Sequence, residues 1–376
     1  MQLKPFLLDI WLDEHEHDIE YNLAASTGPL WTLQEILQLG TEEERRRFGT
    51  QGLAYSHAAG NEHLRAAIAE MQGVTPDCVQ VVTGASEALV ILMWLAAERG
   101  ANLILPRPCF ATFSALPQSL GSEIRFYNLR RENRFRIDLS EIQKLADANT
   151  KLILVNSPHN PTGTTITDQE FDALHDFTAQ RGIQLVSDEV YHPVYHDGES
   201  KSAARLSQAT VIGDFSKALS LAGLRLGWII EPDSQRRQQY WNARAYFTIT
   251  NAPSMEVLGT IAMRNRTTIL TRTQQVASRN LRLLDEFMRE HEHLLQWIRP
   301  RGGLTAFPWM INGENARPFC QRLVREGVLL APGDCFEMPS HFRLGFGNTE
   351  DGFAAALERI HEAVKKLLKG SETRIA

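Results

Sequence analysis

From residue 79 onward, short apolar runs alternate with segments of helical periodicity. The apolar runs lie at residues 79–83, 102–105, 151–156, 183–187, 210–215 and 225–230. Buried strands separated by helices are typical of a parallel sheet that is covered on both faces. The pattern therefore predicts an α/β fold in which helices cover a large, mostly parallel sheet.

The remaining segments predict a second, smaller α+β unit. A long helical period at 267–291 leads out of the sheet region, and shorter elements follow it, ending in a helix at about 350–368. With 376 residues, of which 43% are hydrophobic, the chain is long enough for both units. We expect a large domain at 48–279 and a small domain formed by 280–376 together with the N-terminal segment 1–47.

Polar or glycine- and proline-rich turns follow five of the predicted strands. These turns begin at Gly84, Pro106, Ser157, Asp188 and Ser216. In open α/β sheets, ligands bind outside the carboxyl ends of the strands. We therefore expect the five turns to converge on one crevice.

Lys217 lies in one of these turns, directly after the apolar run 210–215 and Ser216. Burying an unpaired ammonium costs several kcal/mol unless it is neutralised or bonded. A Schiff base between this lysine and an aldehyde cofactor would remove that cost. The alternative is an exposed lysine at the start of a polar loop.

The turn after the first strand can bind an anion. Gly84, Ala85 and Ser86 open an apolar helix, so its free backbone N–H groups and its positive dipole end favour a phosphate. Arg225 can add a bidentate clamp on the same anion. The alternatives are a simple helix cap and an arginine that caps a surface loop.

Three further side chains fit a flat ring that contains a nitrogen atom. Asp188 can hold a protonated ring nitrogen, Asn160 can form hydrogen bonds, and Phe110 can stack on the ring. Their alternatives are a helix N-cap, a proline- and glycine-rich turn, and a core aromatic. With the anion site and the lysine, the set matches a phosphorylated pyridine aldehyde that acts as an electron sink.

The ordered motifs of the chain resemble those of the fold-type I, class I/II aminotransferases, which use pyridoxal 5′-phosphate (PLP). The four main motifs are NSPHNPTG at 156–163, SDEVY at 187–191, SK at 216–217 and GLRLG at 223–227. With further matches, the resemblance covers about residues 50–347 in the family's order. It implies PLP as the cofactor and transfer of an amino group from an L-amino acid to a 2-oxo acid.

The resemblance also implies roles for the residues that hold the ring and the substrate. Lys217 would form the Schiff base and move a proton between the substrate Cα and the cofactor C4′, and Asp188 would keep the ring nitrogen protonated. Asn160 and Tyr191 would bond the ring hydroxylate. Arg343 would bind the substrate α-carboxylate as a planar fork, with Asn160 as a second ligand of that carboxylate.

The phosphate ligands implied by the resemblance come from several segments. They are Gly84, Ala85, Ser86, Ser216, Arg225 and Tyr55. Tyr55 would reach across from a second subunit, so we expect a homodimer with shared active sites.

One position departs from the family pattern. Three residues before Lys217 the family usually has a phosphate-binding serine, whereas this chain has Asp214. Two like charges about 4 Å apart repel by roughly 4 kcal/mol at an effective dielectric constant of 20. We expect Asp214 either to turn away from the phosphate or to pair with Arg225.

Composition and spacing exclude several classes of function. The net charge is −6 with interspersed signs, so we expect neither a nucleic-acid nor a membrane partner. The start of the chain lacks the pattern of a secretory signal, which predicts a cytoplasmic protein. The cysteines at 78, 109, 320 and 335 have no metal-ligand spacing, so we expect no metal site.

Two other functions compete with transamination. A PLP-dependent lyase or cyclising enzyme, including a capreomycidine-synthase-like one, shares these motifs because it can expel a β- or γ-substituent instead of adding a proton to the cofactor. A non-catalytic PLP-binding regulatory module is disfavoured, since Lys217, Asp188 and Arg343 are all in place. The acidic residues Asp13, Glu14, Glu16 and Asp18 are either a solvated face or a hint of a basic substrate.

Overall fold

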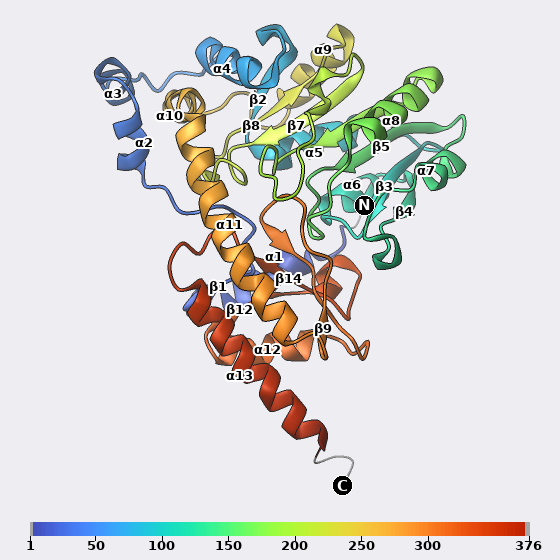
Figure 1. The fold of residues 1–376 in the computed structure, drawn as a ribbon. Coiled ribbons are helices and arrows are strands. Elements are labelled where there is room, and N and C mark those ends of the chain that lie inside the picture. Colours follow the sequence, from blue (N-terminus) through green and yellow to red (C-terminus); the bar gives the residue numbers. More distant parts are fainter. Residues whose placement is uncertain (1–2, 373–376) are drawn as a thin grey trace.

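A seven-stranded sheet forms the centre of the large domain in the computed structural model, which describes residues 3–372 (Figure 1). The strands in spatial order are β2 (Val79–Val82), β8 (Gly227–Ile230), β7 (Ala209–Asp214), β6 (Gln184–Asp188), β5 (Thr150–Asn156), β3 (Asn102–Arg107) and β4 (Glu123–Asn128). Strands β7, β6, β5, β3 and β4 run parallel, whereas β8 is antiparallel to both of its neighbours.

The predicted mostly parallel sheet is confirmed, with two differences. The segment predicted at 225–230 runs against the other strands, so the start of β8, rather than its end, lies at the edge where β7 ends. Strand β4 was not predicted, because its sequence EIRFYN mixes charged and apolar residues. It lies at the edge of the sheet and is mostly not fully buried, so it needs no continuous apolar run.

Helices pack around this sheet. Helix α5 (Gly84–Ala96) is almost entirely apolar and contacts β7 and β8, and α8 (Asp168–Arg181) contacts β6. The other helices of the large domain are α4 (Glu62–Gln72), α6 (Thr112–Ser119), α7 (Leu139–Leu145), α9 (Ser234–Arg244) and α10 (Pro253–Arg264). Because β5 is buried except at one position, hydrophobic burial on both faces of the sheet fixes its place in the centre.

The small domain contains short strands and three helices. Its strands are β9 (Leu295–Gln296), β10 (Thr305–Ala306), β11 (Trp309–Met310), β12 (Val328–Leu329), β13 (Ala331–Pro332) and β14 (Phe342–Gly345). Its helices are α12 (Arg317–Arg325), α13 (Phe353–Glu372) and, from the N-terminal segment, α1 (Leu7–His15). The long helix α11 (Arg266–Glu290) runs from the large domain down to this unit (Figure 1).

The N-terminal segment joins both units. Strand β1 (Tyr21–Asn22) pairs with β12 in parallel, so this part of the chain lies against the C-terminal strands. Helices α2 (Leu33–Leu39) and α3 (Glu42–Gly49) instead pack on α10, where Glu44 pairs with Arg264 at 2.6 Å. The N-terminal segment therefore contacts helices of both units, and the domain boundaries at 47 and 279 stay a prediction.

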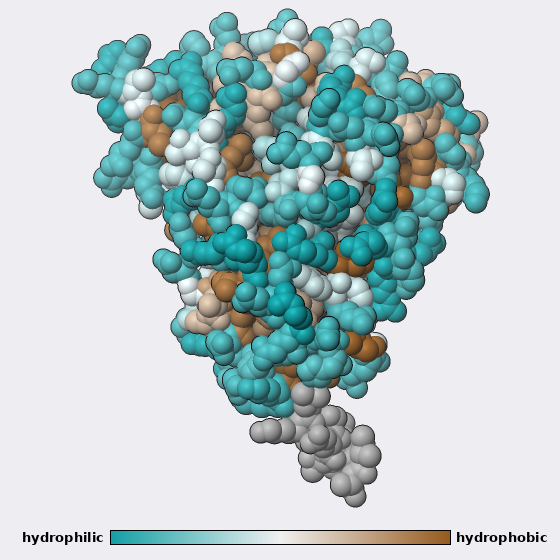
Figure 2. All heavy atoms as spheres, viewed as in Figure 1, coloured by the Kyte–Doolittle hydropathy of each residue, from teal (hydrophilic) through white to brown (hydrophobic). Residues whose placement is uncertain are grey.

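Hydrophilic residues dominate the face of the molecule seen in Figure 2, where hydrophobic residues form separate spots. Within residues 3–372, no helix has both the length and the apolar composition that a bilayer span requires.

Candidate active site

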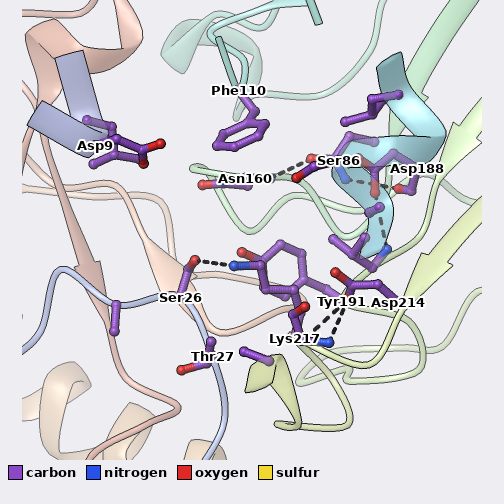
Figure 3. A pocket seen from close by; sticks show the side chains of 18 of the residues that line it. Asp9, Ser26, Thr27, Ser86, Phe110, Asn160, Asp188, Tyr191, Asp214 and Lys217 are labelled. Atoms are coloured by element: carbon purple, nitrogen blue, oxygen red, sulfur yellow. Dashed lines mark hydrogen bonds between the residues drawn. The ribbon is translucent and has the colours of Figure 1, made fainter. Parts of the chain in front are cut away.

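The predicted site residues surround one cavity of about 320 Å³ (Figure 3). Ten of them line it: Ala85, Ser86, Phe110, Asn160, Asp188, Tyr191, Ser216, Lys217, Arg225 and Arg343. They come from the carboxyl ends of β3, β5, β6 and β7, the start of α5, the segment before β8, and β14. The predicted convergence of the turns is thus what the structure contains.

One end of the cavity is suited to an anion. Helix α5 begins at Gly84, and the side chain of the preceding Thr83 does not cap it. The backbone N–H groups of the first turn are therefore open to a ligand. Arg225 enters this end because β8 runs antiparallel and starts there. A Cβ atom on Gly84 would lie 2.8 Å from Arg225 Nη2, so only glycine leaves room for the guanidinium, and its φ of +75° also favours glycine.

Asp188 is a buried carboxylate at the end of β6. Its Oδ1 accepts a hydrogen bond from the Val190 N–H at 3.2 Å, and no arginine or lysine among the described residues forms an ion pair with it. Burial raises the pKa of Asp188 to about 7, with a smaller contribution from the nearby carboxylates of Asp214 and Glu189. Such a carboxylate is suited to a cationic hydrogen-bond donor supplied by a ligand.

Asn156 fixes the exits of β5 and β6 relative to each other. Its Nδ2 donates to the Asp188 carbonyl oxygen at 2.9 Å, and its Oδ1 accepts from the Asn160 N–H at 2.8 Å. Asn156 is therefore a positioning residue for two predicted ring ligands, a role that the sequence reasoning did not assign.

Lys217 points into the cavity from the turn after β7. Its Nζ donates a hydrogen bond to Ser26 Oγ at 3.0 Å (Figure 3). Desolvation lowers the pKa of the Lys217 ammonium, and the Asp214 carboxylate opposes part of that shift. A depressed pKa increases the fraction of neutral, nucleophilic amine.

Arg343 lies opposite, on β14, and is fully buried. Its Nη1 donates to Asn160 Oδ1 at 3.1 Å and its Nη2 donates to the Ala24 carbonyl oxygen at 2.6 Å. Its Nε has no hydrogen-bond partner among the described residues. The fork is thus held in place while one buried donor is left for a ligand, which suits a carboxylate.

Comparison with known proteins identifies the family. The profile described as "Aminotransferase class I and II" matches residues 21–360. The chain belongs to the class I and II aminotransferase family.

Individual members are similar over nearly the whole chain. Capreomycidine synthase from Streptomyces vinaceus is 29% identical, over 94% of this chain and 93% of that protein. The structure of a PLP-dependent aminotransferase from Streptococcus suis aligns with a TM-score of 0.92 at 27% identity, covering 97% of this chain and 99% of that one. The structure of the PLP-dependent cyclase OrfR aligns with a TM-score of 0.88 at 27% identity, covering 97% and 98% of the two chains.

The predicted family, fold type and cofactor are confirmed by these findings. The protein is a PLP-dependent aminotransferase of fold type I, whose substrates are an amino acid and a 2-oxo acid.

The cavity offers groups that fit PLP. The Tyr191 hydroxyl is buried near Ser26 and Asp188 without a well-aligned hydrogen-bond partner among the described residues. Burial raises the pKa of this hydroxyl to about 12, so it stays a donor. With the unpaired Asp188 carboxylate and the open amides of α5, the cavity presents partners for a ring hydroxylate, a ring nitrogen and a phosphate.

Phe110 lies at the cavity wall and is also packed against other aromatic rings. The two interpretations of its sequence position, a ring that stacks on a ligand and a core aromatic, are therefore compatible. The Phe110 ring lines the cavity and also makes edge-to-face contacts with Phe6 at 5.2 Å and Phe113 at 6.3 Å between ring centroids. The neighbouring aromatics hold the ring in a fixed orientation at the cavity wall.

Asp214 directs its carboxylate into its own loop. Its Oδ1 accepts from the backbone N–H groups of Ser216 at 2.9 Å and Lys217 at 3.3 Å. Arg225 donates instead to the Ala222 carbonyl oxygen, and no ion pair joins it to Asp214 within residues 3–372. The expected ion pair between Asp214 and Arg225 is therefore absent from the described residues. The Asp214 carboxylate instead accepts hydrogen bonds from the two backbone amides.

Two predicted residues do not line the cavity. Gly84 lies just behind it and shapes the anion end, as described above. Tyr55 is 81% exposed and is not part of the cavity of its own chain. A role for Tyr55 in the same chain is thereby disfavoured, and its proposed role in a second subunit stays a prediction.

The N-terminal segment supplies lining residues that no motif indicated. Leu8, Asp9 and Leu12 of α1 and Ser26 and Thr27 of the following loop all face the cavity. The acidic residues singled out in the sequence, Asp13 among them, do not line it. Tertiary packing brings this segment to the site, through the β1–β12 pair and the hydrogen bond from Trp11 Nε1 to the Leu330 carbonyl oxygen.

Proposed function

We propose that the protein transfers an amino group from an L-amino acid to a 2-oxo acid with Lys217 as the central catalytic residue. The observation that carries the proposal is the partly desolvated Lys217 amine, which faces the cavity between an unpaired carboxylate, Asp188, and a fixed guanidinium, Arg343. When bound, PLP supplies an aldehyde that reacts with amines and a ring that withdraws electrons from the substrate Cα.

Lys217 would act first as a ligand of the cofactor aldehyde and then as a base. Once a substrate amine has replaced it, its Nζ would carry the proton between the substrate Cα and the cofactor C4′. Ser26 Oγ, 3.0 Å from this nitrogen, would orient the amine. A lowered ammonium pKa favours both roles because each requires the neutral amine.

The ring and phosphate would be held by the groups that lack partners in the cavity. Asp188 would accept a hydrogen bond from the protonated ring nitrogen, and Tyr191 and Asn160 would bond the ring hydroxylate. Ala85, Ser86, Ser216 and Arg225 would bind the phosphate. Arg343 would bind the substrate α-carboxylate and so orient the Cα–H bond toward Lys217.

Charge matching supports a substrate with a cationic side chain. The other charged groups of the cavity would each have a partner. PLP and the substrate α-carboxylate would neutralise the charges of Lys217, Asp188, Arg225 and Arg343, and the Asp214 carboxylate has amide partners of its own. Asp9 is left without an ion-pair partner among the described residues, although it lines the opening of the cavity. Burial raises the pKa of Asp9, and the charges of Lys217 and Arg343 oppose that shift.

A homodimer is proposed on the basis of Tyr55 and of an apolar surface around it. Arg244 donates to the Ala58 carbonyl oxygen at 2.7 Å, which joins the loop after Tyr55 to the segment before Tyr246. Exposed large hydrophobic residues gather on these segments and on the end of α5: Leu53, Tyr55, Trp94, Leu95, Tyr246, Phe247 and Ile249. Such a surface is typical of a protein interface.

A cytoplasmic location is proposed with the enzyme. It is supported by the cysteines, since all four are unpaired in the structure.

A PLP-dependent cyclisation or elimination is the second candidate function. It is favoured by the similarity to capreomycidine synthase, which extends over 94% of this chain, and by the similarity to the cyclase OrfR. The same lysine could serve either reaction, because both begin with removal of the Cα proton.

Half-reactions with single amino acids distinguish the two. Transamination predicts that an amino acid alone converts the bound aldehyde to the amine form and releases one equivalent of its 2-oxo acid. Cyclisation or elimination predicts many turnovers without loss of the aldehyde absorbance. A screen of basic, neutral and acidic amino acids in which none gives either result would contradict both functions.

A further inference from the structure

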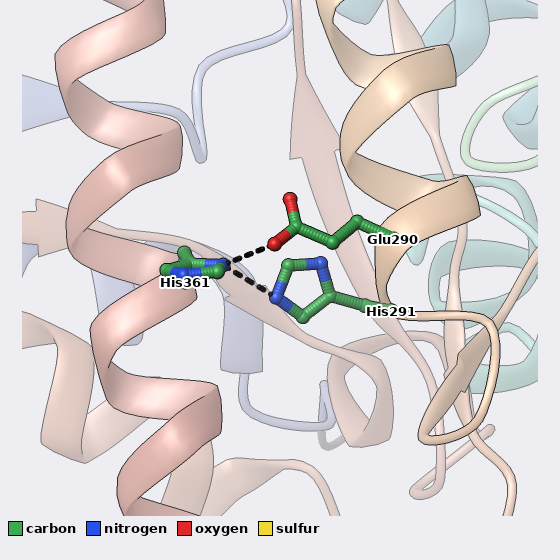
Figure 4. Close-up of side chains that lie close together, drawn as sticks. All are labelled: Glu290, His291 and His361. Carbon is green, nitrogen blue, oxygen red and sulfur yellow. Dashed lines mark hydrogen bonds and ion pairs between the residues drawn. The ribbon is translucent and has the colours of Figure 1, made fainter.

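Two histidines and a glutamate meet at the end of α11, outside the cavity that holds the cofactor residues. Glu290 is the last residue of α11, His291 follows it, and His361 projects from α13 (Figure 4). None of the three lines the cofactor cavity. The donor atoms of the three side chains all lie within 4.8 Å of one another.

The tautomer of His291 is set by its surroundings. Its Nδ1 lies 2.8 Å from the Phe287 carbonyl oxygen, which can only accept a hydrogen bond, so Nδ1 carries the proton. The ring is buried and stacks on Phe287 with 4.3 Å between ring centroids. The lone pair of His291 is therefore on Nε2, in a ring whose orientation is fixed.

This lone pair faces His361. His361 Nδ1 lies 2.9 Å from His291 Nε2 and 3.4 Å from Glu290 Oε1 (Figure 4). In the metal-free protein, His361 Nδ1–H donates to His291 Nε2. The other ring nitrogen of His361 faces Glu362 Oε1 at 4.0 Å, so the proton can instead reside on Nε2, which leaves both facing nitrogens with lone pairs.

We propose that Glu290, His291 and His361 form a binding site for a divalent transition metal ion, with Zn²⁺ as the preferred ion. Two imidazole nitrogens and one carboxylate oxygen are ligands that Zn²⁺ takes at about 2.0–2.2 Å, with water in the fourth position. Ligand atoms around a tetrahedral ion at those bond lengths lie about 3.3 Å apart. The two distances from His361 Nδ1, 2.9 Å and 3.4 Å, are close to this value. The separation between the His291 and Glu290 ligand atoms, which lies within 4.8 Å, would be closed by rotation of the exposed Glu290 side chain.

The contact between His291 Nδ1 and Phe287 is the outer-shell hydrogen bond that metal-bound histidines usually make, and it holds the ligand nitrogen in place.

The bound ion would clamp the last helix to the long helix. α11 runs from the large domain to the small one, and α13 packs against it. A metal that binds only the folded protein stabilises it by mass action. The proposed effect of the ion is therefore to stabilise the contact between α11 and α13, outside the cofactor cavity.

Zinc titration of tag-free holoenzyme, stripped of metal and kept in a buffer without amino acids, tests the proposal. Calorimetry is expected to give one Zn²⁺ per chain, and saturating Zn²⁺ to raise the melting temperature. His361→Gln is expected to weaken binding at least 10-fold. His293→Gln is the matched control, because its ring is 6.5 Å from that of His291 and its donor atoms are not in the cluster. It should bind as the wild type does.

Unchanged turnover of metal-free His361→Gln would show that this variant is folded. Its weaker Zn²⁺ binding could then be attributed to the missing imidazole nitrogen of His361. When Co²⁺ replaces Zn²⁺, the wild type is expected to show the intense visible absorption bands of tetrahedral coordination. His361→Gln is expected not to show them. Absence of saturable Zn²⁺ binding to the wild type, or equal affinities of His361→Gln and His293→Gln, would overturn the proposal and leave a hydrogen-bonded histidine pair.

Discussion

At the residue scale, the site is defined by polar groups that the protein itself leaves unpaired. Asp188 has a single hydrogen bond from a neighbouring amide, the Tyr191 hydroxyl has no well-aligned partner, and Arg343 keeps a free Nε among the described residues. Buried polar groups without partners are costly, and they cluster where a ligand completes them. Under the proposed function, PLP and the substrate carboxylate would supply the matching groups.

Asp188→Asn is predicted to stabilise the apoprotein at high pH and to inactivate the enzyme. Burial raises the pKa of Asp188 from 3.8 to about 7, so the folded apoprotein binds this proton more tightly than the unfolded chain does. The wild-type stability contributed by this group therefore falls as the pH rises from about 4 to 7. Asparagine does not titrate and can still accept from Val190.

Urea unfolding of the two apoproteins from pH 4 to 8 checks this prediction. The variant is expected to match the wild type near pH 4 and to exceed it by on the order of 1–3 kcal/mol at pH 8. Activity of the PLP-loaded variant is expected to fall by about 10²–10³-fold. If the free energies of unfolding of the two proteins changed in parallel with pH, this would contradict the interpretation of Asp188 as a buried carboxylate with a raised pKa.

Arg343→Lys is predicted to impair substrate binding while PLP stays bound. Lysine keeps the positive charge but loses the planar fork, which Asn160 and Ala24 hold in position. We expect kcat/KM to fall about 10²-fold, chiefly through KM for both the amino acid and the oxo acid. Steady-state kinetics with PLP titration checks this, and an unaltered KM would remove Arg343 from the carboxylate site.

At the scale of elements, the buried strands and their turns could be predicted from the sequence. The segments that tertiary packing brings to the site could not. The six predicted strands are all present within two residues at each end, because buried strands are short continuous apolar runs. Strand β4 escaped prediction since it lies at an exposed edge, and the direction of β8 depends on its pairing rather than on its own residues.

Helix α1 shows most clearly why part of the site was not predicted. Trp11 is buried, and its Nε1 donates to the Leu330 carbonyl oxygen at 2.8 Å, across 319 residues of sequence. That contact holds α1 against the small domain and so places Asp9 at the cavity wall. No local pattern encodes a contact between segments so distant in the chain.

Asp9→Asn is predicted to reduce the preference for basic substrates. Asp9 lines the cavity opening without an ion-pair partner, whereas Asp13, one helical turn further along α1, does not line it. An exposed ion pair stabilises a complex by at most about 1 kcal/mol, so kcat/KM for basic amino acids should fall roughly 2- to 5-fold. Neutral amino acids should be affected less, and Asp13→Asn should leave both unchanged.

The comparison is made at low and at high salt, because screening should diminish the difference. Equal losses for neutral and basic amino acids in Asp9→Asn would assign Asp9 to the fold rather than to substrate choice.

At the scale of the whole molecule, the chain is predicted to work as a dimer with shared sites. Tyr55 is exposed and does not line the cavity of its own chain, and it belongs to an apolar surface that a second copy would cover. The oligomeric arrangement was implied by the family motifs, since surface residues carry no periodic pattern that reveals their partner.

Mixing two impaired variants tests the shared site. Lys217→Ala and Tyr55→Ala are each expected to have impaired activity, but a mixed dimer contains one site with both residues intact. Unfolding and refolding an equimolar mixture should restore about a quarter of wild-type activity, since random pairing makes half of the dimers mixed. Recovery no greater than the sum of the separate variants would place both residues in the same chain or exclude Tyr55 from the site.

Reduction of the PLP-saturated protein with borohydride, followed by digestion and mass spectrometry of its peptides, tests directly whether Lys217 forms the covalent bond to the cofactor. Lys217 is the lysine that lines the cavity, and its pKa is lowered by burial. We predict that the phosphopyridoxyl group is found on Lys217 and that adding a substrate amino acid before the reductant prevents its attachment there. Attachment to any other lysine, or none at Lys217 in saturated protein, would contradict this prediction.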